Sequence, residues 1–354
     1  MIVENIILIC PASIKQMPYI NSYIRELTKL DCNLQYIVWD RLGEEEEVNN
    51  TYIYRDNKSG YVRGFFDYLN YSKFVKDILG KNKDVRKVVI FGIPLCYFLC
   101  DHLAKYFEYI VDIRDYHVLS KIYFRFKKHL LKSKVCVISS PGFKQWLPLG
   151  PNYITNHNSD AEVDDIEDVL LDTKKQILNI SCIGALKDYS IIEELLSEAN
   201  ERKISSILFN FHGEGIINDR LCRLSEKLGN VNFKLTGRYS KNDERDLYII
   251  SDWINMFMSR GSLNNETCLS NRLYNSIIYG RPLLCYKGSY IADVVRQYNC
   301  GLVFNDVDDF FDNYKMLTSS FDSTLYNRGR RDFFHEVSKD NKNFIKVLYD
   351  FAME

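Results

Sequence analysis

The sequence predicts an α/β protein made of two Rossmann-like domains, each a parallel sheet covered by helices. Short apolar segments alternate with amphipathic ones along the chain, which is the pattern of parallel strands joined by crossover helices. The 354 residues exceed the usual size of one hydrophobic core, so two domains are expected. One acidic stretch of weak periodicity divides the alternation into two halves.

These observations predict an N-terminal domain over residues 1–160, a linker over 161–175 and a C-terminal domain over 176–325. Residues 326–354 are expected to form one or two amphipathic helices that pack back toward the N-terminal domain. Hydrophobic content of 46% and charged content of 26% are typical of a folded protein. The net charge of -1 gives no overall attraction to nucleic acid.

In the first half, apolar runs rich in β-branched and aromatic residues predict strands at 5–10, 34–39, 51–54, 87–91, 109–113, 135–139 and 153–154. The amphipathic segments between them predict helices at 19–30, 63–79, 95–106, 119–133 and 142–147.

The second half repeats the alternation. Strands are predicted at 176–183, 206–212, 231–235, 253–258, 283–285 and 302–304. Helices are predicted at 191–202, 218–228, 244–250, 269–279, 290–298 and 307–317.

Residues 269–304 are the most informative part of this half, because they predict a helix, a strand, a second helix and a second strand in close succession. Gly280 is expected to end the first helix in a left-handed conformation, and Pro282 prevents its continuation. The following helix would begin beside the carboxyl end of a parallel strand, where a phosphate-bearing ligand is favoured. Arg272 and Asn275 share a face of the first helix, so they could hold a diphosphate and a ribose.

Cysteines and terminal segments suggest the compartment. The ten cysteines show no C-x-x-C pair and no metal-ligand spacing, so we expect buried free thiols in a reducing environment and no bound metal. The first ten residues are too short an apolar run for a signal peptide. A cytoplasmic protein is therefore predicted.

Five motifs of the second half occur in a characteristic order: ILNISCIGAL (177–186), FHGEG (211–215), VNFKLTGRYS (231–240), DLYIISDWINMF (246–257) and RLYNSIIYGRPLL (272–284). The first half adds YIVDIRDYH (109–117), VCVISSPGF (135–143) and YITNHN (153–158). Together they resemble bacterial glycosyltransferases of the family 4-like group, also called group 1, that builds capsule and O-antigen polysaccharides. The resemblance implies the GT-B fold, in which two Rossmann-like domains with parallel sheets face a central cleft.

The same resemblance implies an enzyme that transfers a hexosyl-type sugar from a nucleotide sugar, with retention of configuration and without a cofactor. The expected partners are the nucleotide sugar and a saccharide or lipid-linked saccharide acceptor, and no nucleic acid. Two alternatives remain open. One is a non-catalytic GT-B-like partner or chaperone subunit of an active transferase, and the weaker one is a sugar-nucleotide epimerase.

Site residues follow from the matched motifs. The resemblance implies donor contacts from Gly184, Gly213, Gly215, Arg238, Tyr239, Arg260 and Asn275 in the C-terminal domain. Arg272 and Lys187 are predicted to act in catalysis as cations beside the diphosphate. Asp112, Asp115 and His117 are predicted to bind the acceptor, or to supply a general base if the enzyme inverts. Acceptor contacts are expected from Ser13, Arg114 and Ser140.

Each of these candidates has a structural alternative. Arg272 could be a surface arginine, Lys187 an exposed loop lysine, and the FHGEG glycines a plain tight turn. The Asp112–His117 segment could face a ligand, or its charges could form an ion pair that ties the strand end to the next helix.

Two departures from the family pattern affect the donor site. Asn275 occupies the position of the family's acidic ribose ligand, and an amide gives no charged acceptor. The first loop, PASIKQMP (11–18), contains no glycine, whereas the family's loop is usually glycine-rich.

Residues 121–134, KIYFRFKKHLLKSK, mix aromatic side chains with seven basic or potentially basic ones. Such a segment could rest against the inner face of an anionic membrane as a peripheral contact. The alternative is a core helix with a charged solvent face.

Overall fold

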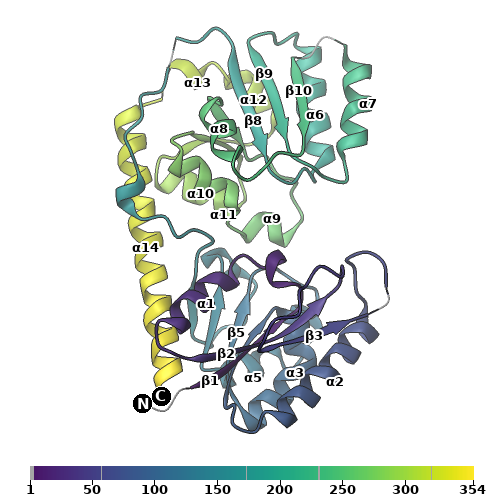
Figure 1. Cartoon of the computed structure of the whole chain (residues 1–354). Coiled ribbons are helices and arrows are strands. Elements are labelled where there is room, and N and C mark those ends of the chain that lie inside the picture. The colour runs from purple at the N-terminus through teal and green to yellow at the C-terminus, as the bar shows by residue number, and fades with distance from the viewer. Residues whose placement is uncertain (1–3, 57, 173, 230–231, 320) are drawn as a thin grey trace. The chain divides into compact units, whose positions relative to one another are not determined.

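The computed structural model describes residues 4–56, 58–172, 174–229, 232–319 and 321–354. The chain divides into two compact units. Unit 1 comprises Met1–His157 and Lys339–Glu354, and unit 2 comprises Asn158–Ser338. Figure 1 shows both units with their helices and strands.

Unit 1 contains a seven-stranded sheet in the order β3-β2-β1-β4-β5-β6-β7, and its neighbouring strands are parallel. The strands are β1 (Asn5–Cys10), β2 (Asn33–Asp40), β3 (Thr51–Arg55), β4 (Lys87–Phe91), β5 (Glu108–Ile113), β6 (Val135–Ile138) and β7 (Tyr153–Thr155). The predictions for 5–10 and 87–91 are confirmed residue for residue. After the polar first residue, both are uninterrupted apolar runs near the sheet centre, where parallel strands are buried on both faces.

Helices cover both faces of this sheet: η1 (Ile14–Gln16), α1 (Ile20–Thr28), α2 (Phe65–Lys81), α3 (Ile93–Tyr106), α4 (Leu119–Ile122), α5 (Phe126–Lys132) and the 3₁₀ helix η2 (Pro141–Gln145). Helices α2, α3 and α5 lie side by side (Figure 1). On the other face, α1 residues such as Tyr23 and Leu27 share one buried cluster with Phe344 and Leu348 from the end of the chain.

The single helix predicted over 119–133 is wrong, because the structure has two short helices there. Tyr123 lies at the break between α4 and α5. Its hydroxyl donates to the carbonyl oxygen of Cys96 at 3.2 Å, and its ring contacts Tyr97 at a centroid distance of 5.0 Å. This side chain is buried against α3, so packing interrupts a segment whose local pattern favours one continuous helix.

Unit 2 contains a six-stranded parallel sheet in the order β10-β9-β8-β11-β12-β13. The strands are β8 (Leu178–Ile183), β9 (Ile207–His212), β10 (Phe233–Gly237), β11 (Trp253–Asn255), β12 (Leu283–Tyr286) and β13 (Gly301–Phe304). The chain leaves β8 toward β9 on one side and returns to β11 on the other. The carboxyl ends of β8 and β11 therefore form the topological switch point, where open parallel sheets bind ligands.

The helices of unit 2 are η3 (Val163–Asp165), α6 (Tyr189–Glu201), α7 (Asn218–Leu228), α8 (Glu244–Ile249), α9 (Leu263–Thr267), α10 (Asn271–Ile278), α11 (Tyr290–Gln297), α12 (Val307–Asn313) and α13 (Met316–Ser319). The helix predicted over 307–317 is thus two helices. The strand predicted over 231–235 begins at a residue outside the described part of the chain, and β10 begins at Phe233. Gly280 ends α10 with φ +67°, as predicted.

The last helix, α14 (Ser323–Met353), is continuous and contributes to both units. In unit 2 its Arg330 is fully buried and donates hydrogen bonds to the carbonyl oxygens of Ile277, Ile278 and Glu167 at 2.7–2.9 Å. This guanidinium binds the last carbonyls of α10, where a cation also complements the helix dipole. Among the described residues, no helix is both long and apolar enough to span a membrane.

Candidate functional site

Arg272 lies at the switch point of the unit 2 sheet. It belongs to the first turn of α10, and its guanidinium donates to two backbone oxygens. Nε donates to the Ile183 carbonyl at 2.7 Å and Nη1 to the Asn255 carbonyl at 2.9 Å, so the side chain joins the last residues of β8 and β11. These two bonds fix a half-buried positive charge where a ligand would meet the sheet.

The loops after β8 and β9 pack against each other through their glycines. A side-chain carbon added to Gly213 would lie 1.9 Å from the Gly184 oxygen, and one added to Gly215 would lie 1.7 Å from the Leu186 oxygen. Gly213 and Gly215 therefore allow the loop after β9 to pack closely against the loop after β8, and the atoms next to them belong to that loop. Gly184 differs, because a carbon added there would meet only Nη2 of Arg272, at 3.9 Å.

Two tyrosines connect α10 to α8 and to the loop after β10. Burial raises the pKa of Tyr248, and a hydrogen bond from the Asn275 amide acts against that shift. Tyr239 donates to Glu244 Oε1 at 3.3 Å. Burial, followed by the Glu244 carboxylate, raises the pKa of Tyr239 to about 12, whereas Arg272 opposes the shift. Glu244 thus brings a carboxylate close to the helix face on which Asn275 lies.

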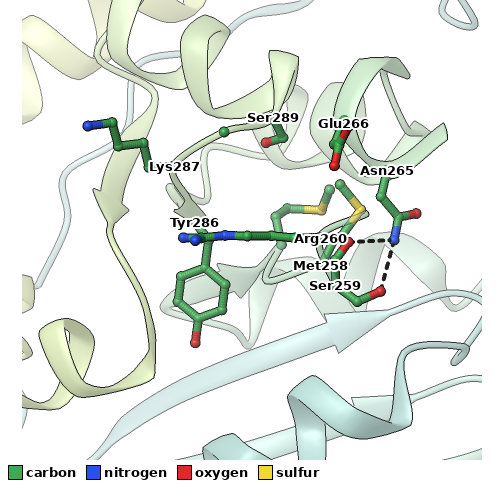
Figure 2. A pocket seen from close by; sticks show the side chains of 10 residues that line it. Met258, Ser259, Arg260, Asn265, Glu266, Tyr286, Lys287 and Ser289 are labelled. Carbon is green, nitrogen blue, oxygen red and sulfur yellow. Dashed lines mark hydrogen bonds between the residues drawn. The ribbon is translucent and has the colours of Figure 1, made fainter. Parts of the chain in front are cut away.

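A hollow lies at the carboxyl ends of β11 and β12 (Figure 2). Asn265 donates to the carbonyl oxygen of Ser259 at 3.1 Å and to its hydroxyl at 3.2 Å, and Glu266 accepts from the Gly261 N–H at 2.8 Å. Ser289 caps α11 by accepting from the Ala292 N–H at 3.2 Å. A hollow beside a capped helix N-terminus favours an anionic group.

The basic residues predicted for the donor site have different surroundings. Arg260 lines the hollow and donates to the Asn305 carbonyl oxygen. Lys187 is exposed on the turn before α6, and Arg238 is exposed after β10. Lys287, which also lines the hollow, points away from the other labelled side chains in Figure 2.

In unit 1, Asp112 and Arg114 form a buried ion pair at the end of β5. Arg114 Nε and Nη2 donate to the two carboxylate oxygens at 2.6 and 2.7 Å, and the Tyr23 hydroxyl donates at 2.6 Å. Arg114 also donates to the Asn156 carbonyl oxygen at 3.0 Å and lies over the Tyr19 ring. Asp112 and Arg114 therefore form an ion pair, and its contacts reach α1 and the segment after β7 rather than the next helix along the chain.

The other predicted residues of unit 1 lie close to strand ends. Asp115 is exposed, and His117 accepts from the N–H of Leu119, the first residue of α4, at 3.2 Å. Burial lowers the pKa of His117. Ser140 caps η2 by accepting from the Gly142 N–H at 3.1 Å. Ser13 is fully buried and donates to Asp40 at 3.4 Å.

Asp40 organises the loop that follows β2. Its carboxylate accepts from the N–H groups of Gly43, Glu44 and Glu45 at 2.8–3.2 Å and from Arg55 Nε at 3.0 Å. Burial raises the pKa of Asp40, but these hydrogen bonds outweigh that effect and hold it below its ordinary value.

The site residues that were not predicted from the sequence are Glu244, Tyr248, Asn265 and Ser289. A local signal existed only for Ser289, which follows a strand and precedes a helix as an N-cap residue. The other three reach the site through packing between elements distant in the sequence. Among the described residues, no group of three or more His, Cys, Asp or Glu side chains could hold a metal ion.

No family model and no curated protein sequence matches the chain. Solved structures match over almost its full length. A glycosyltransferase from Rickettsia africae is 14% identical, with all of both chains covered and a TM-score of 0.65. The lipopolysaccharide outer core galactosyltransferase WaaB is 12% identical, with 98% of this chain and 99% of WaaB covered and a TM-score of 0.68.

A third similar structure is HepE from Anabaena in complex with UDP and glucose. It is 10% identical, with 98% of this chain and 99% of HepE covered and a TM-score of 0.62. The chain has the GT-B fold. The two parallel sheets of this fold were predicted from the sequence, whereas their strand orders are known only from the structure.

Proposed function

We propose that this GT-B protein is a glycosyltransferase that moves a sugar from a nucleotide-sugar donor to a saccharide acceptor. The observation that carries the proposal is the position of Arg272, a fixed cation that joins the ends of β8 and β11. Two of the similar structures are named as glycosyltransferases, and a third contains UDP and glucose.

Arg272 would stabilise the departing nucleotide diphosphate. Two of its N–H groups hold strand carbonyls, so the guanidinium is already oriented before the ligand arrives. Nη2 lies beside Gly184, which adds no side chain that would block a phosphate oxygen. A preorganised cation stabilises the negative charge that develops on the diphosphate, and so lowers the barrier to cleavage of the bond between sugar and phosphate. Lys187 and Arg260 would add positive charge, and the hollow beside α11 would hold the sugar-phosphate part.

The nucleoside would lie against Tyr239 and Asn275, with Arg238 beside the base. Since Asn275 provides no charge, we propose that Glu244 supplies the carboxylate that accepts hydrogen bonds from ribose hydroxyls. Its carboxylate is mostly covered, with 14% of the side chain exposed, and it already bonds Tyr239. Gly213 and Gly215 would act by holding the loop of Gly184 in place.

The acceptor would bind to unit 1, near the ends of β1, β5 and β6. Asp115 and His117 would contact it, while the Asp112–Arg114 pair, Ser13 and Ser140 would position the loops around it. We propose a saccharide or lipid-linked saccharide acceptor in bacterial capsule or O-antigen synthesis, with the protein in the cytoplasm. In a retaining transfer of a hexosyl group, a donor phosphate oxygen would take the acceptor proton, and the side chains would serve to orient the two substrates.

The test uses a panel of nucleotide sugars and nucleoside diphosphates, with thermal shift and nucleotide release as the two measurements. We expect one nucleotide class to raise the melting temperature of the wild type, and Arg272→Ala to lose both this rise and turnover. Arg223→Ala, at an exposed position of α7, is the matched control and should behave as the wild type. If no member of the panel stabilises the wild type, the proposal is wrong.

A further inference from the structure

One face of unit 1 exposes several large apolar side chains of the kind that are normally buried. Phe66 in the first turn of α2 is 75% exposed, and Leu149 after η2 is 82% exposed. Ile122 at the end of α4 is 68% exposed, and Phe124 between α4 and α5 is 86% exposed. Val62, Phe65, Tyr97 and Leu131 are also exposed. An exposed group of this size marks an interaction site. We name it the outer face: 62–66, Tyr97, 121–132 and Leu149.

The outer face is continuous. Helices α2, α3 and α5 lie side by side, and ring contacts connect their exposed ends (Figure 1). The Phe65 ring contacts Tyr97 at 6.1 Å, and Tyr97 contacts Tyr123 at 5.0 Å. At the other end of α5, Leu131 lies 3.6 Å from the side-chain position of Gly150, the residue that follows Leu149. The apolar side chains of the three helices and of the 149–150 turn therefore belong to one surface.

The charge of the outer face has one sign. Residues 116–159 contain no Asp or Glu, and their basic residues are Lys121, Arg125, Lys127, Lys128, Lys132, Lys134 and Lys144. Lys121, Lys127, Lys128 and Lys132 are exposed on the outer face itself. Two acids border the outer face. Asp101 on α3 bonds Arg125 and His129, and Asp67, the residue after Phe66, pairs with Lys58, so the lysines of 121–132 keep most of their charge.

We propose that the outer face binds an anionic lipid bilayer. Exposed Phe, Ile and Leu side chains insert at the boundary between headgroups and acyl chains, and neighbouring lysines attract anionic headgroups. A second copy of the chain fits the outer face less well than a bilayer does. A two-fold contact through this face would place the same lysines of both copies close together, and their charges would repel. The outer face contains no residue of the donor site, and it adds residues of α2, α3 and the 149–150 turn to the basic segment 121–134.

The experiment is vesicle sedimentation of the full chain, with phosphatidylglycerol/phosphatidylcholine vesicles compared with phosphatidylcholine alone. The wild type should bind the anionic vesicles, and binding should weaken with salt. Lys127→Glu/Lys128→Glu should lower the partition coefficient at least about 25-fold, because each basic residue near the surface contributes roughly fivefold. Ile122→Ser/Phe124→Ser should lower it on vesicles of both compositions.

Matched controls lie in unit 2, where Leu170 and Ile216 are 93% and 92% exposed. Leu170→Ser/Ile216→Ser should bind vesicles as the wild type does, and circular dichroism checks that all variants are folded. The proposal is overturned if the wild type does not bind anionic vesicles, or if the outer-face variants bind like the controls. It is also overturned if the chain is a dimer that Ile122→Ser/Phe124→Ser separates, because that result assigns the outer face to a second copy.

Discussion

Arg330 provides the sharpest test of how α14 supports the candidate site. Its fully buried guanidinium binds the Ile277, Ile278 and Glu167 carbonyls and the Asn327 side chain. Arg330→Met keeps much of the side-chain volume but removes every one of these donors. Each buried carbonyl left without its partner costs about 1 kcal/mol or more, and the lost cation at the α10 terminus costs about 0.5 kcal/mol.

Two effects act in the opposite direction. Burial lowers the pKa of Arg330, which means that desolvation of the charged form already costs free energy in the native protein. Methionine avoids that cost and fills the space. We therefore expect a net loss of about 3 kcal/mol in the free energy of unfolding of unit 2, near the lower end of the range for breaking a buried charged network.

The assay is native-state hydrogen exchange read by mass spectrometry, because it resolves the opening free energy of β8 and β11 peptides from that of unit 1. Arg331→Met is the matched control at the next residue. Arg331 pairs with Asp168 at the surface, with 39% and 63% of the side chains exposed, so solvent screens the pair and its loss should cost ~0.5 kcal/mol or less. Equal effects of the two substitutions would refute the role assigned to Arg330.

Two further predictions concern the loops. Gly213→Ala should destabilise unit 2 by about 3 kcal/mol or more, since the added carbon would lie 1.9 Å from a backbone oxygen. The control is Gly261→Ala, also at positive φ but with nothing within 4 Å, which should cost only about 1–2 kcal/mol. Urea denaturation measures the unfolding free energy of both variants. For Asp40, the lowered pKa means that its carboxylate stabilises unit 1 above the unfolded value of about 4, and that this contribution is lost as the pH falls through the lower folded value. The difference in unfolding free energy between wild type and Asp40→Asn should therefore shrink as the pH is lowered below about 4, and a difference that stays constant over this range would contradict the assignment.

Local pattern was sufficient for most of the fold. The strands at 5–10 and 87–91 are buried on both faces, so each is apolar after its first residue, Asn5 or Lys87, and its limits are clear. Gly280 ended its helix as expected because glycine adopts the left-handed conformation of a helix terminus without steric cost. The break at Tyr123 was not predictable, because its cause is a contact with α3 about 27 residues earlier in the chain.

In the candidate site, too, local sequence predicted some features and tertiary contacts determine the others. Arg272 was identified from its place on a helix face, but its two carbonyl partners belong to strands 17 and 89 residues away. Glu244 was missed because nothing in its own segment distinguishes it from a solvated helix residue. Glu244 becomes a site residue only because tertiary packing brings α8 next to the loop after β10 and next to α10.

The division of α14 between the two units has a consequence for synthesis on the ribosome. Unit 2 is a single continuous segment, whereas unit 1 needs Phe344, Leu348 and Phe351 to cover one face of a sheet whose strands were made first. All of unit 2 must therefore emerge before the unit 1 core can close. Until then the apolar surface around β1 and α1 stays uncovered, so nascent or prematurely terminated chains should be the form of this protein that most needs a chaperone.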